Sequence, residues 1–349
     1  MSTVPFIQSM RPEPVRDQYG RYVLPDPKDG APRSWTRATT IAHTLEDTHH
    51  LTQWKRRMVL QGAAAEPALL QGVGDLADEL AQATDWRAAK KIKEQLDLLC
   101  DAAAEVAGAG DGASWGTLLH TITEYADAGR LNEIGDQIPD KLVEDLDAYL
   151  TVMDGAGIGR PADYIERILV NTGVDAAGTT DRILVMPTPC PGCGGTLKIG
   201  DLKTQKSVDM GWLSIAIQLA EYAYADAMVD TATGDLVPMP EELCRCLGIV
   251  MHLPVGKATC TLYQLDLVAG WEAARAAHTV RQFRDRSKAM GAPYTPPLAA
   301  TGDRVLTLIR SANHPSALVA LYRDLHPKGK WTPAHTAAAA ARKAELLSA

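Results

Sequence analysis

The strongest constraint on this chain is a pair of predicted strands near its middle, each of which carries an acidic residue. Residues 179–185 (Thr-Thr-Asp-Arg-Ile-Leu-Val) form the first strand, and residues 197–204 (Leu-Lys-Ile-Gly-Asp-Leu-Lys-Thr) form the second. The aliphatic and β-branched residues in both runs favour extended structure. Because alternate side chains of a strand share a face, Asp201 and Lys203 point the same way, and Leu202 points into the core.

The pair Asp201-x-Lys203 suits metal-assisted hydrolysis, because a carboxylate can hold a hard cation while a lysine orients or helps to deprotonate water. Taken alone the pair is weak, since 22% of the residues are charged and a solvated strand face often carries an ion pair of little energetic value. Its context is more specific. Asp181 lies on the preceding strand, and Gln218 and Tyr222 share a face of the helix predicted to follow.

Further candidates lie upstream of these strands. A helix is predicted to open at Ser114, and it places His120 and Glu124 four residues apart on one face. A single histidine on such a helix is usually an ordinary core or surface residue. Residues 164–170 predict another strand, which carries Glu166. Glu166 is either at the edge of a site or an exposed strand carboxylate.

The order His120, Glu166, Asp181, Asp201-x-Lys203, Gln218-x-x-x-Tyr222 resembles the PD-(D/E)xK nuclease superfamily. Within it, the chain is most similar to the RecB-type branch that includes CRISPR-associated and bacteriophage exonucleases. Gly116, four residues before His120, matches the Gly-x-x-x-His motif of that branch. The likeness covers residues 112–268.

The resemblance implies an α/β fold with a restriction-endonuclease-like α-β-β-β-α core, in which helices flank a mixed central sheet. It implies three parts: an N-terminal arm and helical region (1–111), the nuclease core (112–268) and a helical C-terminal appendage (269–349).

The resemblance also implies roles for individual residues. One or two Mg²⁺ or Mn²⁺ ions would be held by His120, Asp181, Asp201 and the backbone carbonyl of Leu202, with Glu166 as a further candidate ligand. The implied catalytic residues are Asp181, Asp201, Lys203, Gln218 and Tyr222, and the residues implied to contact DNA are Gln218, Tyr222 and Lys206.

The function so implied is that of a metal-dependent DNA exonuclease in phage-type recombination, replication or repair. One alternative is an endonuclease of the same fold, and another is a non-catalytic DNA-binding recombination partner. The intact set of acids and lysine argues against the last, because binding alone does not need both acids. The expected partners are single- or double-stranded DNA, a recombination or replication protein, and further copies of the chain.

Two cysteines lie between the carboxylate strands. Cys190 and Cys193 are separated by Pro-Gly and followed by two glycines. A Cys-x-x-Cys pair in a tight turn is half of a zinc site. No second half follows nearby in the sequence, so the pair is either part of a Zn²⁺ or other metal site or a hairpin with free thiols.

The remaining cysteines are Cys100, Cys244, Cys246 and Cys260. Some relatives of the RecB-type branch hold an iron-sulfur cluster with one upstream and three downstream cysteines. The spacing here differs, and we therefore expect no such cluster. Residues 244–252 and 258–267 predict paired strands around a turn.

The charge and hydropathy of the chain bear on its partners and location. The formal net charge is −8, which does not exclude a nucleic-acid partner because bound cations invert the field of clustered carboxylates. Basic clusters at 55–57, 90–93 and 281–288 are candidate phosphate contacts or ordinary solvated helix faces. No run approaches the roughly 20 apolar residues of a membrane span, and the first ten residues lack a signal-peptide pattern. We therefore expect a cytoplasmic protein.

The flanking regions are predicted more coarsely. Residues up to about 34 are rich in Pro, Asp, Arg and Gly and predict an arm or loops, after which a helical run begins. The other predicted helices cover residues 77–107, 138–153, 212–229 and 271–290 and parts of the C-terminal tail.

Overall fold

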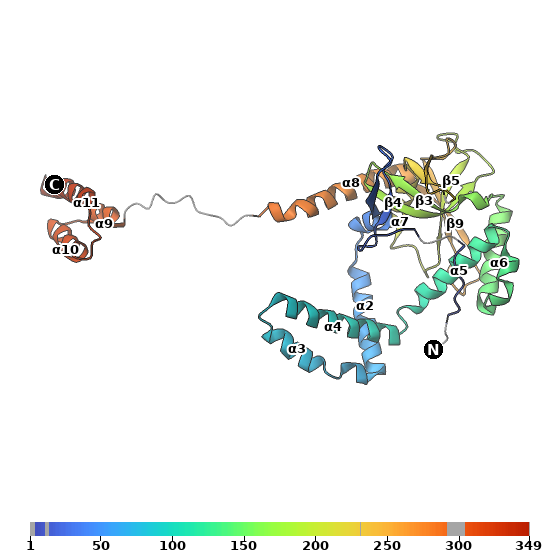
Figure 1. The fold of residues 1–349 in the computed structure, drawn as a ribbon, viewed down its shortest axis with the longest axis horizontal. Helices are drawn as coiled ribbons and strands as arrows, with labels where there is room; N and C mark the ends of the chain where they lie inside the picture. The colour runs from blue at the N-terminus through green and yellow to red at the C-terminus, as the bar shows by residue number, and fades with distance from the viewer. Residues whose placement is uncertain (1–3, 11–13, 231, 292–303, 349) are drawn as a thin grey trace. The chain divides into compact units, whose positions relative to one another are not determined.

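A mixed nine-stranded sheet, counted in the part of the chain that the structure describes, carries the residues of interest (Figure 1). The structure is a computed structural model that describes residues 4–10, 14–230, 232–291 and 304–348. The strands are β1 (Tyr22–Pro25), β2 (Pro32–Arg37), β3 (Ile165–Asn171), β4 (Ala176–Val185), β5 (Leu197–Lys203), β6 (Ala227–Val229), β7 (Leu236–Pro238), β8 (Leu247–His252) and β9 (Thr261–Asp266).

The main path of the sheet has the order β7-β6-β3-β4-β5-β8-β9. Strands β3, β4 and β5 form an antiparallel meander, and β8 adds to β5 in parallel. The N-terminal hairpin β1–β2 joins through a short parallel pairing of β2 with β4. The strand β5, which carries Asp201 and Lys203, is therefore covered on both edges.

Helices cover both faces of this sheet. The helices are α1 (Ala38–Ala42), α2 (His49–Ala65), α3 (Val73–Gln82), α4 (Trp86–Val106), α5 (Asp111–Asp127), α6 (Asp140–Gly155), α7 (Trp212–Ala223), α8 (Leu267–Arg286), α9 (Arg304–Ser311), α10 (Pro315–Leu325) and α11 (Pro333–Ser348). One buried cluster joins α7 to the sheet through Ile199 and Val250. A second cluster joins α5 and α6 to the opposite face through Leu202 and Met251. This alternation is what a two-residue strand period produces.

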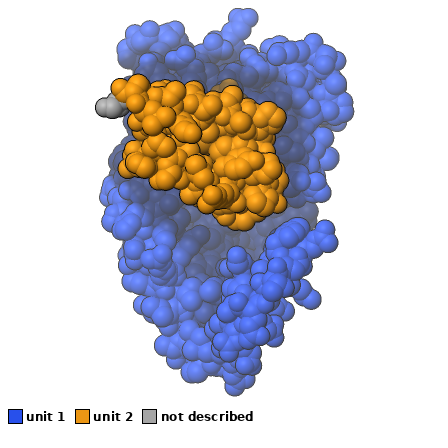
Figure 2. All heavy atoms as spheres, turned by 90° about the vertical axis from the view of Figure 1, so that its left-hand side faces the viewer, with its two compact units in different colours: residues 1–285 blue, residues 286–349 orange. Residues whose placement is uncertain are grey.

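The chain divides into two compact units, Met1–Asp285 and Arg286–Ala349 (Figure 2). The first contains the sheet and α1–α7, together with most of α8. The second is a small bundle of α9, α10 and α11, which buries Ile309 and Leu318 in a core of its own. No helix among the described residues is long and apolar enough to cross a membrane.

The predicted fold class is confirmed: the protein is mixed α/β, with helices flanking the sheet and helical regions at both ends. The predicted order of helix, three strands and helix is found as α5, β3–β5 and α7, with α6 inserted after α5. The helix predicted at 212–229 ends at Ala223, because the chain turns there into the buried strand β6.

The prediction for the N-terminal segment was wrong for residues 22–37, whereas the helical run predicted after them is found as α1 and α2. Residues 22–37 form the β1–β2 hairpin and not loops followed by a helix. Trp35 is fully buried, its indole N–H donates to the Leu24 carbonyl over 3.2 Å, and the Arg33 guanidinium lies over its ring. The two strands were missed because they are short and contain Pro25 and Pro32, which weaken a strand signal.

Candidate functional site

The two predicted carboxylates lie beside each other on adjacent strands. In the antiparallel ladder of β4 and β5, Arg182 pairs with Gly200, so Asp181 and Asp201 stand at the next position along it. Asp181 Oδ2 accepts a 2.7 Å hydrogen bond from the backbone N–H of Leu202. This bond fixes the Asp181 carboxylate against the middle of the Asp201-Leu202-Lys203 segment.

Asp201 is buried, with 2% of its surface exposed, and Lys203 Nζ lies 2.7 Å from its Oδ2. Burial raises the pKa of Asp201 to about 6, while Lys203 opposes the rise. Burial lowers the pKa of Lys203, but the carboxylates of Asp201 and Asp181 outweigh it and the pKa is raised. Lys203 is therefore an ammonium, suited to orienting a ligand more than to removing a proton.

His120, on α5, points toward the Asp181 carboxylate. Its Nδ1 lies 3.6 Å from Asp181 Oδ2. Burial lowers the pKa of His120, which favours the neutral imidazole that can bind a metal. Gly116 allows this approach, since a Cβ there would come 2.5 Å from Thr204 Oγ1 at the end of β5. The neighbouring Glu124 is buried and accepts a hydrogen bond from Ser9.

A buried arginine that sequence reasoning missed holds α5 onto β4. Arg182 is next to Asp181 but lies on the opposite face of the strand. Its Nε is 2.8 Å from Asp127 Oδ2, and its Nη2 donates to Thr123 Oγ1 over 3.0 Å. Asp127 and Thr123 belong to the helix that carries His120, so this network sets the distance between His120 and Asp181. The sequence did offer one signal: Arg182 lies in a predicted core strand, on the face opposite Asp181, where an arginine needs a buried partner.

Gln218 and Tyr222 meet as their spacing on α7 predicts. Gln218 Nε2 donates to the Tyr222 hydroxyl over 3.1 Å. Tyr222 is only 3% exposed, and its ring occupies the space beside Gly178 on β4, where a Cβ would come within 2.8 Å of it. Burial raises the pKa of Tyr222 well above its usual range. Gln218 is thus the more exposed member of the pair, and the Tyr222 hydroxyl holds its amide in place.

Glu166 lies opposite Asp181 in the β3–β4 ladder, because the neighbouring pairs are Ile165 with Arg182 and Arg167 with Thr180. Its backbone φ is +50°, a left-handed value that is rare for a residue with a side chain. Backbone strain of this kind gathers at functional sites. Lys206 is exposed in the loop between β5 and α7.

Aromatic side chains continue this face of the sheet beyond Lys203. In the parallel pairing of β5 with β8, Lys203 stands beside His252. The ring of His252 lies 6.3 Å from that of Tyr263 on β9, and Tyr263 contacts Trp212 at the start of α7 over 5.0 Å. Tyr263 is 37% exposed. Sequence reasoning missed this row because its members come from three separate elements.

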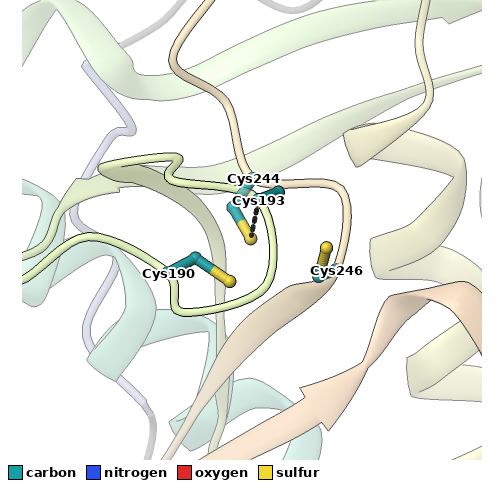
Figure 3. A group of neighbouring side chains, drawn as sticks. All are labelled: Cys190, Cys193, Cys244 and Cys246. Carbon is teal, nitrogen blue, oxygen red and sulfur yellow. Dashed lines mark hydrogen bonds between the residues drawn. The ribbon is translucent and has the colours of Figure 1, made fainter.

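Four cysteines form a second cluster on the β4–β5 hairpin (Figure 3). Their Sγ atoms all lie within 4.8 Å of one another, and Cys193 Sγ is 3.4 Å from Cys244 Sγ. Cys190 and Cys193 stand in the hairpin turn, while Cys244 and Cys246 stand just before β8. This partly buried cluster could hold a metal ion such as Zn²⁺.

The cysteine prediction was therefore half complete. The missing half, Cys244-x-Cys246, was assigned to a strand, but β8 begins only at Leu247. Cys100 and Cys260 lie outside the cluster. The sequence contained the second pair, but it gave no sign that residues 51 positions apart, Cys193 and Cys244, would meet.

The two sites differ in how closely the protein gathers possible metal ligands. Among the described residues, the four cysteines are the one group of three or more His, Cys, Asp and Glu side chains gathered closely enough to hold a metal ion. His120, Asp181 and Asp201 are brought to one place but do not form so tight a group.

No model of a known protein family and no curated protein matches this chain. Its function must therefore be argued from the geometry of the two sites.

Proposed function

We propose that the protein is a Mg²⁺- or Mn²⁺-dependent deoxyribonuclease of the PD-(D/E)xK superfamily that degrades DNA from its ends. The observation that carries the proposal is the meeting of Asp181, Asp201 and Lys203 on adjacent strands, with His120 lying 3.6 Å from Asp181. All four residues belong to the motif order that resembles the superfamily, and their proximity in the fold supports the proposal.

The donor set fits a hard cation. Asp201 contributes a buried carboxylate whose Oδ2 lies 2.7 Å from the Lys203 ammonium, and carboxylates are ligands that Mg²⁺ and Mn²⁺ prefer. Asp181 and the carbonyl of Leu202 would complete the protein ligands, with neutral His120 beside them. Mg²⁺ usually keeps several waters and takes one or two carboxylates together with substrate phosphates. The looser grouping of His120, Asp181 and Asp201, compared with the four cysteines, is consistent with this coordination of Mg²⁺.

When bound, the cation would lower the pKa of a coordinated water and neutralise charge on the scissile phosphate. Lys203, as an ammonium beside Asp201, would align the water or stabilise the phosphate oxygens. Gln218, held by Tyr222, would orient the strand near that phosphate. The bond from Leu202 N–H would keep the Asp181 carboxylate turned toward the same point.

Nucleic acid is favoured as the substrate by the aromatic row of Trp212, Tyr263 and His252, which continues the face that bears Lys203. Aromatic side chains stack on bases without regard to sequence, and each stacked base contributes about 1–3 kcal/mol to binding. Lys206, exposed in the adjoining loop, would contact a phosphate. A role in phage-type recombination, replication or repair follows the family resemblance.

Nuclease activity should be measured on end-labelled linear single- and double-stranded DNA and on closed circular DNA, with Mg²⁺, Mn²⁺ or EDTA. The wild type should be compared with Asp201→Ala and with the matched control Asp163→Ala, an exposed acid before β3. We expect metal-dependent shortening of linear DNA that spares circles, retained in the control and lost in Asp201→Ala.

Cutting of closed circles would replace the exonuclease assignment by an endonuclease. No cleavage of any substrate by wild type, with DNA binding retained, would overturn the catalytic proposal in favour of a non-catalytic DNA-binding partner. The position of the retained label would give the polarity.

A further inference from the structure

We infer that the four-cysteine cluster is a structural zinc site, in which one Zn²⁺ bound by Cys190, Cys193, Cys244 and Cys246 joins the β4–β5 hairpin to the segment that leads into β8. The inference does not depend on the nuclease proposal, because it stands on sulfur geometry and loop packing at the far end of the β4–β5 hairpin from Asp201 and Lys203.

The sulfur positions match a single tetrahedral ion. With Zn–S bonds of about 2.3 Å, tetrahedral geometry separates the sulfurs by about 3.8 Å. Cys193 Sγ and Cys244 Sγ are 3.4 Å apart, and no two of the four sulfurs are more than 4.8 Å apart. Small side-chain rotations would close the difference. A multi-iron cluster needs some of its thiolates further apart, because they are divided among two or more irons.

The two loops are hydrogen-bonded to each other before any metal is considered. Leu197 N–H donates to the Glu242 carbonyl over 3.2 Å, and Cys244 N–H donates to the Leu197 carbonyl over 2.8 Å. Gly195 stands where the loops cross, since a Cβ there would come 2.8 Å from the Glu242 carbonyl oxygen and 2.9 Å from Cys244 Cα. The backbone therefore presents the two cysteine pairs to each other in a fixed arrangement.

The turn around the first pair is shaped for thiolate binding. Gly194 adopts a left-handed φ of +75°, and its N–H donates to the Cys190 carbonyl over 2.8 Å. In the second pair, Leu247 N–H points at Cys244 Sγ over 3.3 Å. Backbone N–H groups aimed at sulfur stabilise metal-bound thiolates and fix their orientation. Softer thiolate ligands select zinc over the hard cations proposed for the acidic site.

A closed site of four thiolates leaves no position for substrate, so its role is structural. It fastens the starts of β5 and β8, which are the strands that carry Asp201, Lys203 and His252. Without the metal, β5 would follow a glycine-rich turn and β8 an irregular loop, with no metal link between the two segments.

The test is metal analysis of the full-length protein by mass spectrometry after gel filtration into metal-free buffer. We expect about one zinc per chain for wild type, and the same for the control variants Cys100→Ser and Cys260→Ser. Cys193→Ser and Cys246→Ser, at the two more exposed positions, should lose most of the zinc. After Co²⁺ replaces zinc, the visible spectrum should show the strong bands of tetrahedral thiolate coordination.

A second measurement does not depend on the variants' folding. Titration of wild-type thiols with an organomercurial should release zinc in proportion to four modified cysteines. Absence of zinc from wild type, zinc release unrelated to thiol modification, iron in place of zinc, or a Cys193–Cys244 disulfide in freshly isolated protein would each overturn the assignment.

Discussion

The β4–β5 hairpin carries two candidate metal sites that differ in almost every respect. At the turn, four cysteine sulfurs from two loops lie within 4.8 Å of one another. As thiolates they would occupy all four coordination positions of a tetrahedral ion. Further along the strands, the carboxylates of Asp181 and Asp201 lie beside the Lys203 ammonium, and His120 approaches Asp181 from α5. A site built for stability closes around its ion, and a site built for chemistry stays incomplete without its substrate.

The largest expected effect concerns the acidic site. Asp201→Asn should lower metal-dependent cleavage by at least about 100-fold, the scale found when one group that stabilises a transition state is lost. The variant should stay folded, because Asn keeps the shape of Asp201 and the Lys203 ammonium still faces the Asp181 carboxylate. Its zinc content should not change, because Asp201 is not among the four cysteine ligands. Single-turnover cleavage, thermal unfolding and metal analysis check this. Cleavage within a few-fold of wild type would break the contrast between the sites.

At the cysteine site, we expect the main effect of a loss to be on thermal stability. Removing zinc with 1,10-phenanthroline, or by Cys246→Ser, should lower the Tm of the unit 1–285 by on the order of 10 °C, since a ligand that binds only the folded state stabilises it by several kcal/mol. Differential scanning calorimetry measures the shift. An unchanged Tm in protein shown to have lost its zinc would contradict a structural role.

How far the sequence could predict each site follows from the same comparison. Asp201 and Lys203 were expected on one face because strands have a two-residue period, and Gln218 and Tyr222 because helices bring residues four apart together. That these residues and Asp181 belong to one site was implied by the resemblance to the nuclease superfamily. The pairing of Cys190 and Cys193 with Cys244 and Cys246 depends on β8 lying parallel to β5, a long-range contact that no local pattern encodes. The same holds for the Arg182–Asp127 ion pair and for the aromatic row.

A matched pair of glycine variants sharpens the account of the cysteine site. Gly195→Ala places a methyl group 2.8 Å from the Glu242 carbonyl oxygen, in rigid backbone, and should cost about 1–3 kcal/mol and weaken zinc retention. Gly192→Ala meets only Cys246 Sγ at 3.7 Å and Cys190 Sγ at 3.9 Å, which are ordinary contacts. Denaturant unfolding and zinc release against a competing chelator should separate the two variants. Equal behaviour would mean that the crossing of the loops does not define the site.

Glu221 on α7 is a buried carboxyl group without a nearby cation among its described hydrogen-bond partners, and it provides a test of how burial changes the pKa of such a group. It is buried, and neither of its oxygens has a hydrogen-bond partner among the described residues. Burial raises its pKa well above the usual value of 4.5. The folded state therefore binds a proton that the unfolded state has lost, so this group's contribution to stability falls as pH rises above 4.5.

Glu221→Gln should consequently be more stable than wild type at neutral pH, with an advantage that shrinks as pH falls toward 4.5. Thermal unfolding of both proteins between pH 4 and 8 measures this. A constant difference in Tm across that range would show that Glu221 is not the titrating group.

The smallest expected effect is at Lys206. If the exposed ammonium contacts one phosphate, Lys206→Ala should weaken DNA binding alike for all sequences and reduce the slope of log K against log salt by about 1. Binding should be measured with Asp201→Asn as the non-cleaving background. A change confined to one DNA sequence would indicate base contact instead.

The central claim is that two metals serve two separate purposes on one hairpin. It is tested most directly by transferring wild-type protein into buffer without divalent cations and measuring DNA cleavage and zinc content on the same sample. We predict that cleavage stops and returns when Mg²⁺ or Mn²⁺ is added, while about one zinc per chain remains throughout. Cleavage that continues without added cation and disappears only when zinc is removed would contradict the account.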